Sequence, residues 1–224
     1  MWTERTRSLF LRLPAGAVLA FKPGQFVSVE LPVDGGEPLV RAYSLASSPE
    51  DGKLLEICVD LVPGGPVSTS LFALRPGDSL SFKGPFGTFV LDDPPATELV
   101  FVATGTGIAP IRPMVRRAVE RGGTQAVRVL HGARVPEELV YRSELEGWAR
   151  REPRLSWECF LAGRSAGVGE SPPLEAAVAE RYVRADAQRH RHFWICGVGA
   201  IVHRLRDLLR EAGYERRAVR YERW

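Results

Sequence analysis

The sequence predicts two domains, an antiparallel β-barrel over residues 1–95 and a doubly wound α/β domain over residues 96–224. In the first part, short runs rich in Val, Phe, Ile and Leu alternate with clusters of Gly, Pro and Asp. In the second part, apolar strands alternate with helical patterns, and a polar stretch rich in proline, DDPPATE at 92–98, separates the two patterns. The first pattern is typical of a small barrel, and the second of a parallel sheet covered by helices.

Three apolar runs predict strands in the first part: GQFVSVELP at 24–32, LLEICVDLV at 54–62 and DSLSFKGPFGTFVL at 78–91. The turn clusters PVDGGEP, SPEDGK, PGGP and RPGD lie between and around these runs. Short strands at this spacing, divided by such turns, favour a small antiparallel barrel.

The second part predicts strands within ELVFVAT (98–104), AVRVLHGA (126–133), RLSWECFLA (154–162) and RHFWICGV (191–198). Helices are expected over 111–122, 136–152, 172–183 and 200–213, and the tail from Tyr214 adds a last strand. The run ELVFVAT is continuously apolar, as expected of a strand that is covered on both faces. Strands and helices in alternation predict a parallel sheet.

Composition excludes several classes of protein. The net charge of +3 is too small, and too little interleaved with aromatic residues, for a nucleic-acid binder. No apolar run reaches the roughly 20 residues that span a bilayer, and the first residues lack a signal-peptide pattern, so we expect a cytoplasmic monomer. Three scattered cysteines exclude a disulfide framework and an iron–sulfur cluster within this sequence. The HRH stretch at 190–192 is interpreted as a solvated loop, so we expect no metal site.

The stretch FVATGTGIAP at 101–110 begins as a buried strand and breaks into glycines. Glycines allow close backbone approach to a ligand, and the next helix offers N–H groups to a phosphate. The dinucleotide fingerprint G-x-G-x-x-G fails here, because Pro110 stands where its third glycine belongs. The stretch alone is equally compatible with a plain strand–turn–helix corner.

Three further stretches carry polar groups suited to nucleotides. In RAYSLASSP, Arg41 can neutralise a diphosphate, while strand alternation puts Arg41 and Tyr43 on one face and Ser44 on the other. In LVPGGPVSTSLF at 61–72, free glycine backbone and the helix-capping residues Ser68 and Thr69 offer a second anion site. In FWICGV, a strand ends at Cys196 and Gly197, where an open sheet binds ligands. Taken singly, these stretches are also compatible with an exposed strand, a hairpin connection and a buried thiol.

Together these stretches resemble the ferredoxin–NADP(+) reductase family. RAYS matches its R-x-Y-S motif, GPFGTFVL at 84–91 its segment closing the barrel, and GTGIAP its nicotinamide-domain glycine motif. CGVGAIV is similar to the family's C-G-x-x-x-M-V with Ile201 in place of methionine, and YERW resembles its aromatic C-terminus. The resemblance runs from Gly24 to Trp224.

The resemblance implies FAD bound by the barrel and NADPH bound by the α/β domain, with NADH less favoured. The FAD-binding residues it implies are Arg41, Ala42, Tyr43, Ser44, Cys58, Val59, Asp60, Leu61, Gly65, Pro66, Val67, Ser68, Thr106 and Trp224. For NADP they are Gly105, Gly107, Ala133, Arg134, Gly163, Arg164, Cys196 and Gly197. Ser44, Cys196 and Glu222 are implied to be catalytic, by orienting the nicotinamide for hydride transfer to the flavin.

Coenzyme choice depends on arginines. Arg134 in HGAR and Arg164 in LAGRS fall where bacterial NADP-using members carry arginines, which suit a 2′-phosphate. A further arginine of those members is missing, because the segment reads GVGESPPLEAAV. NADP is therefore favoured over NAD.

The implied activity is that of an FAD-dependent oxidoreductase that exchanges hydride with NADP(H) and single electrons with a ferredoxin, a flavodoxin or another acidic electron-transfer protein. One alternative is the NAD(P)H-dependent reductase component of an oxygenase system, with the iron–sulfur cluster in a partner. Another is a non-catalytic, flavin-binding regulatory subunit, and a third is a free flavin reductase.

Overall fold

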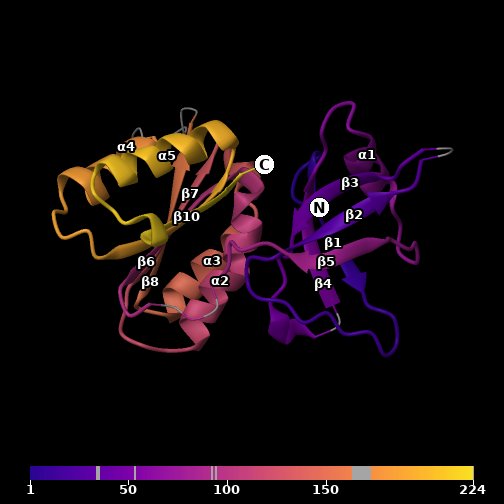
Figure 1. Cartoon of the computed structure of the whole chain (residues 1–224), viewed down its shortest axis with the longest axis horizontal. Coiled ribbons are helices and arrows are strands. Elements are labelled where there is room, and N and C mark those ends of the chain that lie inside the picture. Colours follow the sequence, from indigo (N-terminus) through magenta and orange to yellow (C-terminus); the bar gives the residue numbers. More distant parts are fainter. Residues whose placement is uncertain (34–35, 53, 92, 94, 163–172, 224) are drawn as a thin grey trace.

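The computed structural model describes residues 1–33, 36–52, 54–91, 93, 95–162 and 173–223. It has an N-terminal part of antiparallel strands and a C-terminal part with a parallel sheet, which lie side by side (Figure 1). The predicted fold class is therefore confirmed. No helix among the described residues is both long and apolar enough to span a membrane.

The N-terminal part contains two antiparallel sheets around one core. One sheet pairs β1 (Thr6–Arg12) with β4 (Leu54–Asp60), and the other has the order β3 (Leu39–Ser44), β2 (Phe26–Leu31), β5 (Phe82–Phe86). The short η1 (Pro49–Asp51) and helix α1 (Pro66–Ala73) flank β4 in the chain. Alternate residues of β2 and β4, among them Val27, Val29, Ile57 and Val59, are buried in the shared core, as the period of two requires.

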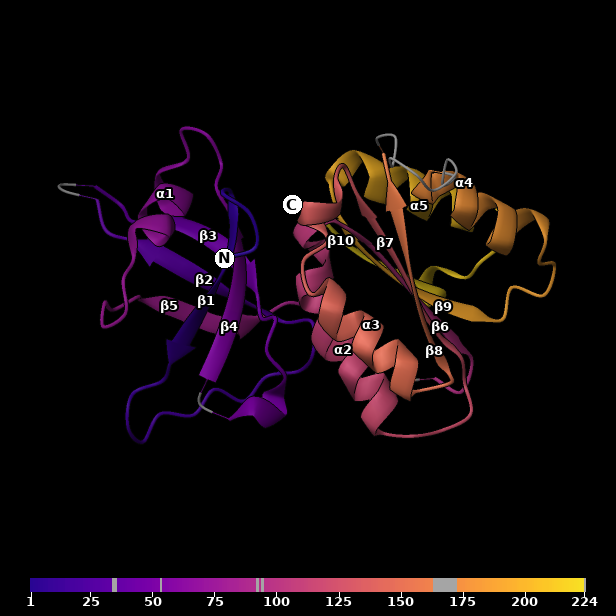
Figure 2. The same cartoon turned by 180° about the vertical axis from the view of Figure 1, so that it is seen from behind.

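The C-terminal part is a sheet of parallel strands in the order β10 (Val219–Arg223), β9 (Arg191–Gly197), β6 (Glu98–Thr104), β7 (Val127–Ala133), β8 (Leu155–Leu161). Helices α2 (Ile108–Glu120) and α3 (Arg142–Arg151) cover the face toward the N-terminal part (Figure 2). Helices α4 (Leu174–Ala179), extended by η4 (Glu180–Arg184), and α5 (Gly199–Glu211) cover the other face. The remaining short helices are η2 (Gly105–Gly107), η3 (Pro136–Glu138) and η5 (Arg216–Ala218).

The position of β6 in the fold explains why its sequence is a continuous apolar run. Leu99, Phe101 and Ala103 pack into the core under α2 and α3, whereas Val100 and Val102 pack into the core under α4 and α5. Both faces of the strand are therefore dry, and every position from 99 to 103 is apolar.

The helix predicted over 136–152 is wrong in one respect, because it is interrupted. The 3-10 turn η3 ends at Glu138, and Tyr141 adopts the left-handed conformation with φ of 60° before α3 begins at Arg142. The Tyr141 hydroxyl donates a 2.8 Å hydrogen bond to Glu56 of β4. This contact with the other part of the molecule is set by tertiary structure, which outweighs the local helical pattern.

Arginines of α2 fasten the two parts to each other. Arg112 donates at 2.7 Å to the buried Glu56 carboxylate and at 2.8 Å to the Ala46 carbonyl. Further along the helix, Arg116 pairs with Asp51 and Arg117 with Glu50, both in η1. The arginines of α2 look in the sequence like an ordinary solvent-exposed basic face, but in the structure they form part of the interface between the two parts.

Candidate functional site

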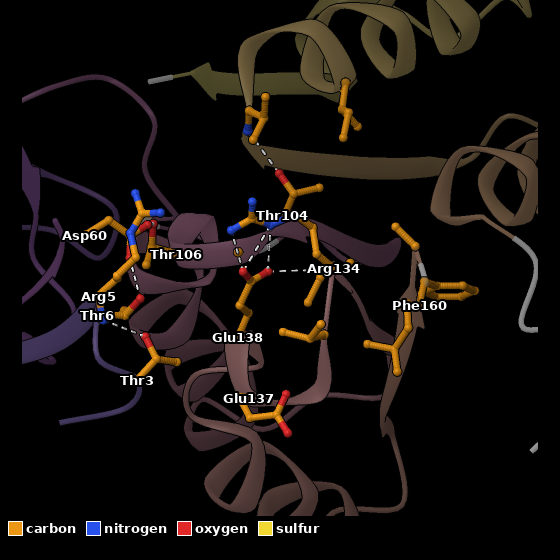
Figure 3. A pocket seen from close by; sticks show the side chains of 18 of the residues that line it. Thr3, Arg5, Thr6, Asp60, Thr104, Thr106, Arg134, Glu137, Glu138 and Phe160 are labelled. Carbon is orange, nitrogen blue, oxygen red and sulfur yellow. Dashed lines mark hydrogen bonds and ion pairs between the residues drawn. The ribbon is translucent and has the colours of Figure 1, made fainter. Parts of the chain in front are cut away.

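A cavity of about 920 Å³ lies where the two parts meet. Its wall includes the N-terminal residues 3–6, the segment 60–63 after β4, the turn 104–106 after β6, and the ends of β7 and β8. Figure 3 shows side chains from these segments around one space. The volume is in the range of cavities that hold small-molecule cofactors.

The cavity lies at the carboxyl ends of the parallel strands, where the strand order reverses. From β6 the chain moves to β7 and β8 on one side, then returns to β9 and β10 on the other. Ligands of open α/β sheets bind in the crevice that forms at such a reversal. The turn Gly105–Gly107 follows β6, and Gly197 ends β9, so both glycine segments face this crevice.

Gly197 is required by its neighbour across the crevice. Its φ is +150°, and a Cβ atom placed there would lie 1.9 Å from Thr104 Oγ1. The same Thr104 oxygen accepts a 2.9 Å hydrogen bond from the backbone N–H of Val198. The Thr104 hydroxyl therefore fixes the end of β9 against the end of β6, and only glycine fits between them.

A buried histidine supports the glycine turn from below. His131 Nε2 lies 3.0 Å from the carbonyl oxygen of Gly105, whose φ is +53°. Since a carbonyl only accepts, Nε2 carries the proton. Complete burial lowers the pKa of His131 to about 4, against a smaller opposite effect of the bond to Gly105. The ring is therefore neutral, and it holds the turn without bringing charge to the cavity floor.

Asp60 connects the glycine turn to the N-terminal part. Its carboxylate accepts hydrogen bonds from Thr106 of η2 at 2.9 Å and from Thr6 of β1 at 2.6 Å (Figure 3). Three segments that are far apart in the sequence thus meet at one carboxylate.

Ser44, Cys196 and Glu222 lie near one another where the end of β3 meets β9 and β10. The Ser44 hydroxyl lies 3.4 Å from Glu222 Oε1, and Glu222 is the register partner of Cys196 in the parallel pair β9–β10. Burial raises the pKa of Glu222 to about 7, although the hydrogen bond from Ser44 opposes the shift. Burial, with the Glu222 charge, raises the pKa of Cys196, so its thiol stays protonated.

Comparison with known proteins identifies the fold and the family. Residues 2–91 match the family model of an oxidoreductase FAD-binding domain, and residues 101–207 that of an oxidoreductase NAD-binding domain. A relative named ferredoxin–NADP reductase B, from Sorangium cellulosum, is 37% identical over 97% of this chain and 91% of its own length. The chain belongs to the ferredoxin–NADP(+) reductase family. It is an oxidoreductase that uses FAD and a nicotinamide nucleotide.

This reductase is also similar to a monooxygenase reductase subunit and to a cytochrome P450 reductase. The glycine betaine monooxygenase reductase subunit of Pseudomonas aeruginosa is 32% identical over 96% of this chain, which spans only 58% of that subunit. The Amycolatopsis cytochrome P450 reductase GcoB is 28% identical, with a TM-score of 0.86 over 98% of this chain and 65% of its own. A Neisseria gonorrhoeae ferredoxin NADP+ reductase with bound FAD and NADP, 22% identical, shares the fold with a TM-score of 0.81 over 99% of this chain and 94% of its own.

The N-terminal part of this reductase has groups that fit the diphosphate of FAD. Helix α1 begins after Gly65 with no side-chain cap, so its first N–H groups are open to an anion. A Cβ at Gly65 would approach Ser68 Oγ to 2.9 Å and the Val62 carbonyl oxygen to 3.1 Å, so a larger residue here would have to displace its neighbours. The predicted capping role of Ser68 and Thr69 is wrong, because both lie inside α1 and Gly65 precedes the helix. The Ser68 hydroxyl instead bonds the backbone of Val62 and Gly65. Arg41 is exposed on β3, and this strand contacts α1 (Figure 1).

The cavity brings together only some of the predicted residues. Its wall contains Asp60, Leu61, Gly105, Thr106, Ala133 and Arg134, whereas Gly107, the last residue of the turn, is buried and is not part of the wall. The other predicted FAD residues lie within β3, β4 and α1 or directly before α1: Arg41, Ala42, Tyr43, Ser44, Cys58, Val59, Gly65, Pro66, Val67 and Ser68. Burial raises the pKa of the Cys58 thiol to about 12, so this side chain of β4 is a neutral group in the core that also contains residues of α2 and β6. Gly163, Arg164 and Trp224 lie outside the described residues.

Sequence reasoning missed several wall residues, among them Thr3, Arg5, Glu137, Glu138 and Phe160. The N-terminal ones carry no motif and reach the cavity only because β1 pairs with β4. A signal for Glu138 was present, since it stands four residues after Arg134, the spacing of a helical ion pair.

Proposed function

We propose that this chain carries hydride between NADP(H) and FAD, and single electrons between FAD and a ferredoxin, a flavodoxin or another acidic electron-transfer protein. The observation that carries the proposal is the contact of Ser44 with Glu222, the register partner of Cys196 on β9, which is one of the two strands at the strand-order reversal. The 37% identity to a ferredoxin–NADP reductase, over most of both chains, supports the same reaction.

FAD, when bound, accepts a hydride from the nicotinamide and releases electrons one at a time. The chain's own residues then have positioning and protonation roles. Ser44 Oγ and the Cys196 thiol are neutral groups that would orient the reacting rings. Glu222, with a pKa of about 7, can hold or release a proton at its carboxyl oxygens near neutral pH.

The charged ends of both cofactors have matching groups. Arg41 and the open N-terminus of α1 would bind the FAD diphosphate, and Gly105 and Gly107 would let the nicotinamide nucleotide approach the start of α2. Arg134, on the cavity wall, would meet the 2′-phosphate that distinguishes NADP from NAD.

A second candidate function is that of a reductase component in an oxygenase system. The likeness to the glycine betaine monooxygenase reductase subunit and to GcoB favours it. Both are longer than this chain, which has three cysteines and therefore cannot supply the four thiolates of an iron–sulfur cluster. In that function the cluster lies outside the residues of this sequence.

We also propose that the protein acts as a cytoplasmic monomer. The free state of Cys58, Cys159 and Cys196 supports a reducing compartment, and the net charge of +3 supports an acidic partner.

The purified protein, saturated with FAD, tests the proposal. We expect NADPH to bleach the flavin absorbance without oxygen, and the reduced protein to pass electrons to a ferredoxin. Protein that binds no flavin contradicts the main proposal, and flavin that NADPH does not reduce favours the regulatory subunit. Preferred reduction of an oxygenase-type [2Fe–2S] partner over a ferredoxin or flavodoxin favours the second candidate.

A further inference from the structure

The guanidinium of Arg134 is held by a carboxylate of the same loop. Arg134 Nε lies 3.0 and 3.2 Å from the two carboxylate oxygens of Glu138, and Nη2 lies 2.5 Å from Oε1. The backbone N–H of Arg134 donates to the same carboxylate at 3.1 Å (Figure 3). The Nε–Nη2 edge used here is one that also binds a phosphate in bidentate fashion. Glu138 thus occupies a phosphate-binding edge of Arg134.

The two side chains differ in exposure. Both side chains are on the cavity wall, where that of Arg134 is 80% exposed to solvent and that of Glu138 is 24% exposed. The Glu138 backbone N–H donates to the Val135 carbonyl, which fixes the backbone of Glu138 in η3. The carboxylate is therefore the fixed member of the pair, and the guanidinium is the member that a ligand can reach.

Acidic groups outnumber basic ones on the described cavity wall. Arg5 and Arg134 face five carboxylates, those of Glu4, Asp60, Glu137, Glu138 and Glu175. Of these, Asp60 is hydrogen-bonded by two threonines and Glu175 pairs with Arg204. Glu137 lies beside Glu138 and pairs with no cation among the described residues. An added phosphate dianion therefore enters a wall that already carries negative charge near Arg134.

We propose that Glu138 determines coenzyme selectivity, by competing with the 2′-phosphate of NADPH for the Arg134 guanidinium and thereby narrowing the preference over NADH. The inference rests on the proposed function, which places the nicotinamide nucleotide in this cavity. NADH lacks the 2′-phosphate, so its binding does not require Arg134 to leave Glu138.

In the opposite role, Glu138 holds the Arg134 guanidinium in position to bind the 2′-phosphate. Removing the Glu138 charge would then lower the preference for NADPH, whereas competition predicts that it raises this preference.

The substitution Glu138→Gln distinguishes them, because a glutamine oxygen still accepts the Arg134 backbone N–H while the negative charge is lost. Binding is measured calorimetrically on the FAD-loaded protein with 2′,5′-ADP and 5′-AMP, which differ only in the 2′-phosphate. We expect the affinity ratio of 2′,5′-ADP to 5′-AMP to rise about tenfold at low salt, and less at high salt. The ratio of kcat/KM for NADPH and NADH should rise likewise, mainly through KM.

Glu146→Gln is the matched control. Glu146 pairs with Arg142 at the same spacing of four residues, at 2.8 Å, and is not part of the cavity wall. In the double variant Arg134→Gln/Glu138→Gln, the affinity ratio of 2′,5′-ADP to 5′-AMP should not rise, because the guanidinium that binds the 2′-phosphate is absent. A lower ratio in Glu138→Gln means that Glu138 positions Arg134, and an unchanged ratio means that it has no part in selectivity; either result overturns the inference. Failure of the proposed function is a separate result, namely that neither nucleotide binds the wild-type protein.

Discussion

The hydroxyl of Ser44 lies 3.4 Å from a carboxylate oxygen of Glu222, although 178 residues separate the two in the sequence. Ser44 ends a strand of the N-terminal part, and Glu222 lies on the last strand of the parallel sheet. The contact therefore exists only when both parts are folded and correctly placed. It creates a half-buried carboxyl at the seam where the proposed hydride transfer takes place.

Replacing Glu222 by glutamine should change how stability depends on pH. The folded-state pKa of Glu222, about 7, is above the ordinary value of 4.5, so the folded protein favours the protonated form. That contribution is fully present below pH 4.5 and is lost as the pH rises through 7. Relative to wild type, Glu222→Gln should therefore gain stability between pH 4.5 and 7 and keep the gain above it, as measured by urea unfolding.

The control is Glu215→Gln, which removes a more exposed carboxylate shortly before the same strand. Its stability relative to wild type should stay constant over this range. Ser44→Ala removes the hydrogen bond that lowers the Glu222 pKa. In this variant the loss of stability that accompanies deprotonation of Glu222 should therefore occur at higher pH than in wild type. A Glu222→Gln profile parallel to wild type would show that Glu222 is not the titrating group.

The interface between the two parts should depend on Arg112 far more than on its neighbour Arg116. Arg112 and Glu56 are 19% and 6% exposed, whereas Arg116 and Asp51 are each 33% exposed. Removing one partner of a buried pair leaves an uncompensated charge and costs about 3 kcal/mol, while an exposed pair contributes about 1 kcal/mol or less. Arg112→Met should therefore lower the free energy of unfolding by about 3 kcal/mol, and Arg116→Met by about 1 kcal/mol or less.

Equilibrium unfolding in urea, followed separately by fluorescence and far-UV circular dichroism, measures both effects. If Arg112 couples the two parts, its loss should also separate one transition into two. If Arg112→Met and Arg116→Met lower the free energy of unfolding equally, Arg112 does not have the larger role at the interface.

Gly197→Ala tests the contact between the two glycine segments. The added methyl would meet Thr104 Oγ1 at 1.9 Å, in a backbone conformation that other residues rarely adopt. Strain and overpacking together should cost about 3 kcal/mol or more and weaken NADP+ binding. Gly16→Ala is the matched control, since Gly16 also has a positive φ, of +80°, but open space around it. Similar losses in the two variants, measured by thermal unfolding and NADP+ titration, would rule out the clash with Thr104.

The parts of the fold that depend on local sequence could be predicted, whereas those set by distant contacts could not. The strands of the sheet and the glycine turn follow from apolar runs and from residues that permit a sharp turn. The break at Tyr141 depends on a hydroxyl contact with Glu56, 85 residues away, which no local pattern contains. Ser44, Cys196 and Glu222 were grouped through resemblance to a family, because neither spacing nor composition joins the first strands to the last one. Arg134 was found in the same way, but its engagement by Glu138 becomes visible only in the structure.

His131 should make the protein sensitive to acid over a range that Glu222 does not explain. Its folded-state pKa, about 4, is below the ordinary value of 6.5, so the unfolded chain binds a proton first as the pH falls. Its neutral state therefore supports full stability above pH 6.5, and about 3 kcal/mol should be lost as the pH falls to 4. This direction is opposite to that of Glu222, so the single variants separate the two effects.

His131→Gln keeps a donor for the Gly105 carbonyl and cannot be protonated, so its unfolding free energy should change less over this range. Urea unfolding at pH 7 and at pH 4.5 measures the difference, with the exposed His190→Gln as control. If wild type and His131→Gln lose the same stability on acidification, the buried imidazole under the glycine turn is not the origin of the acid sensitivity.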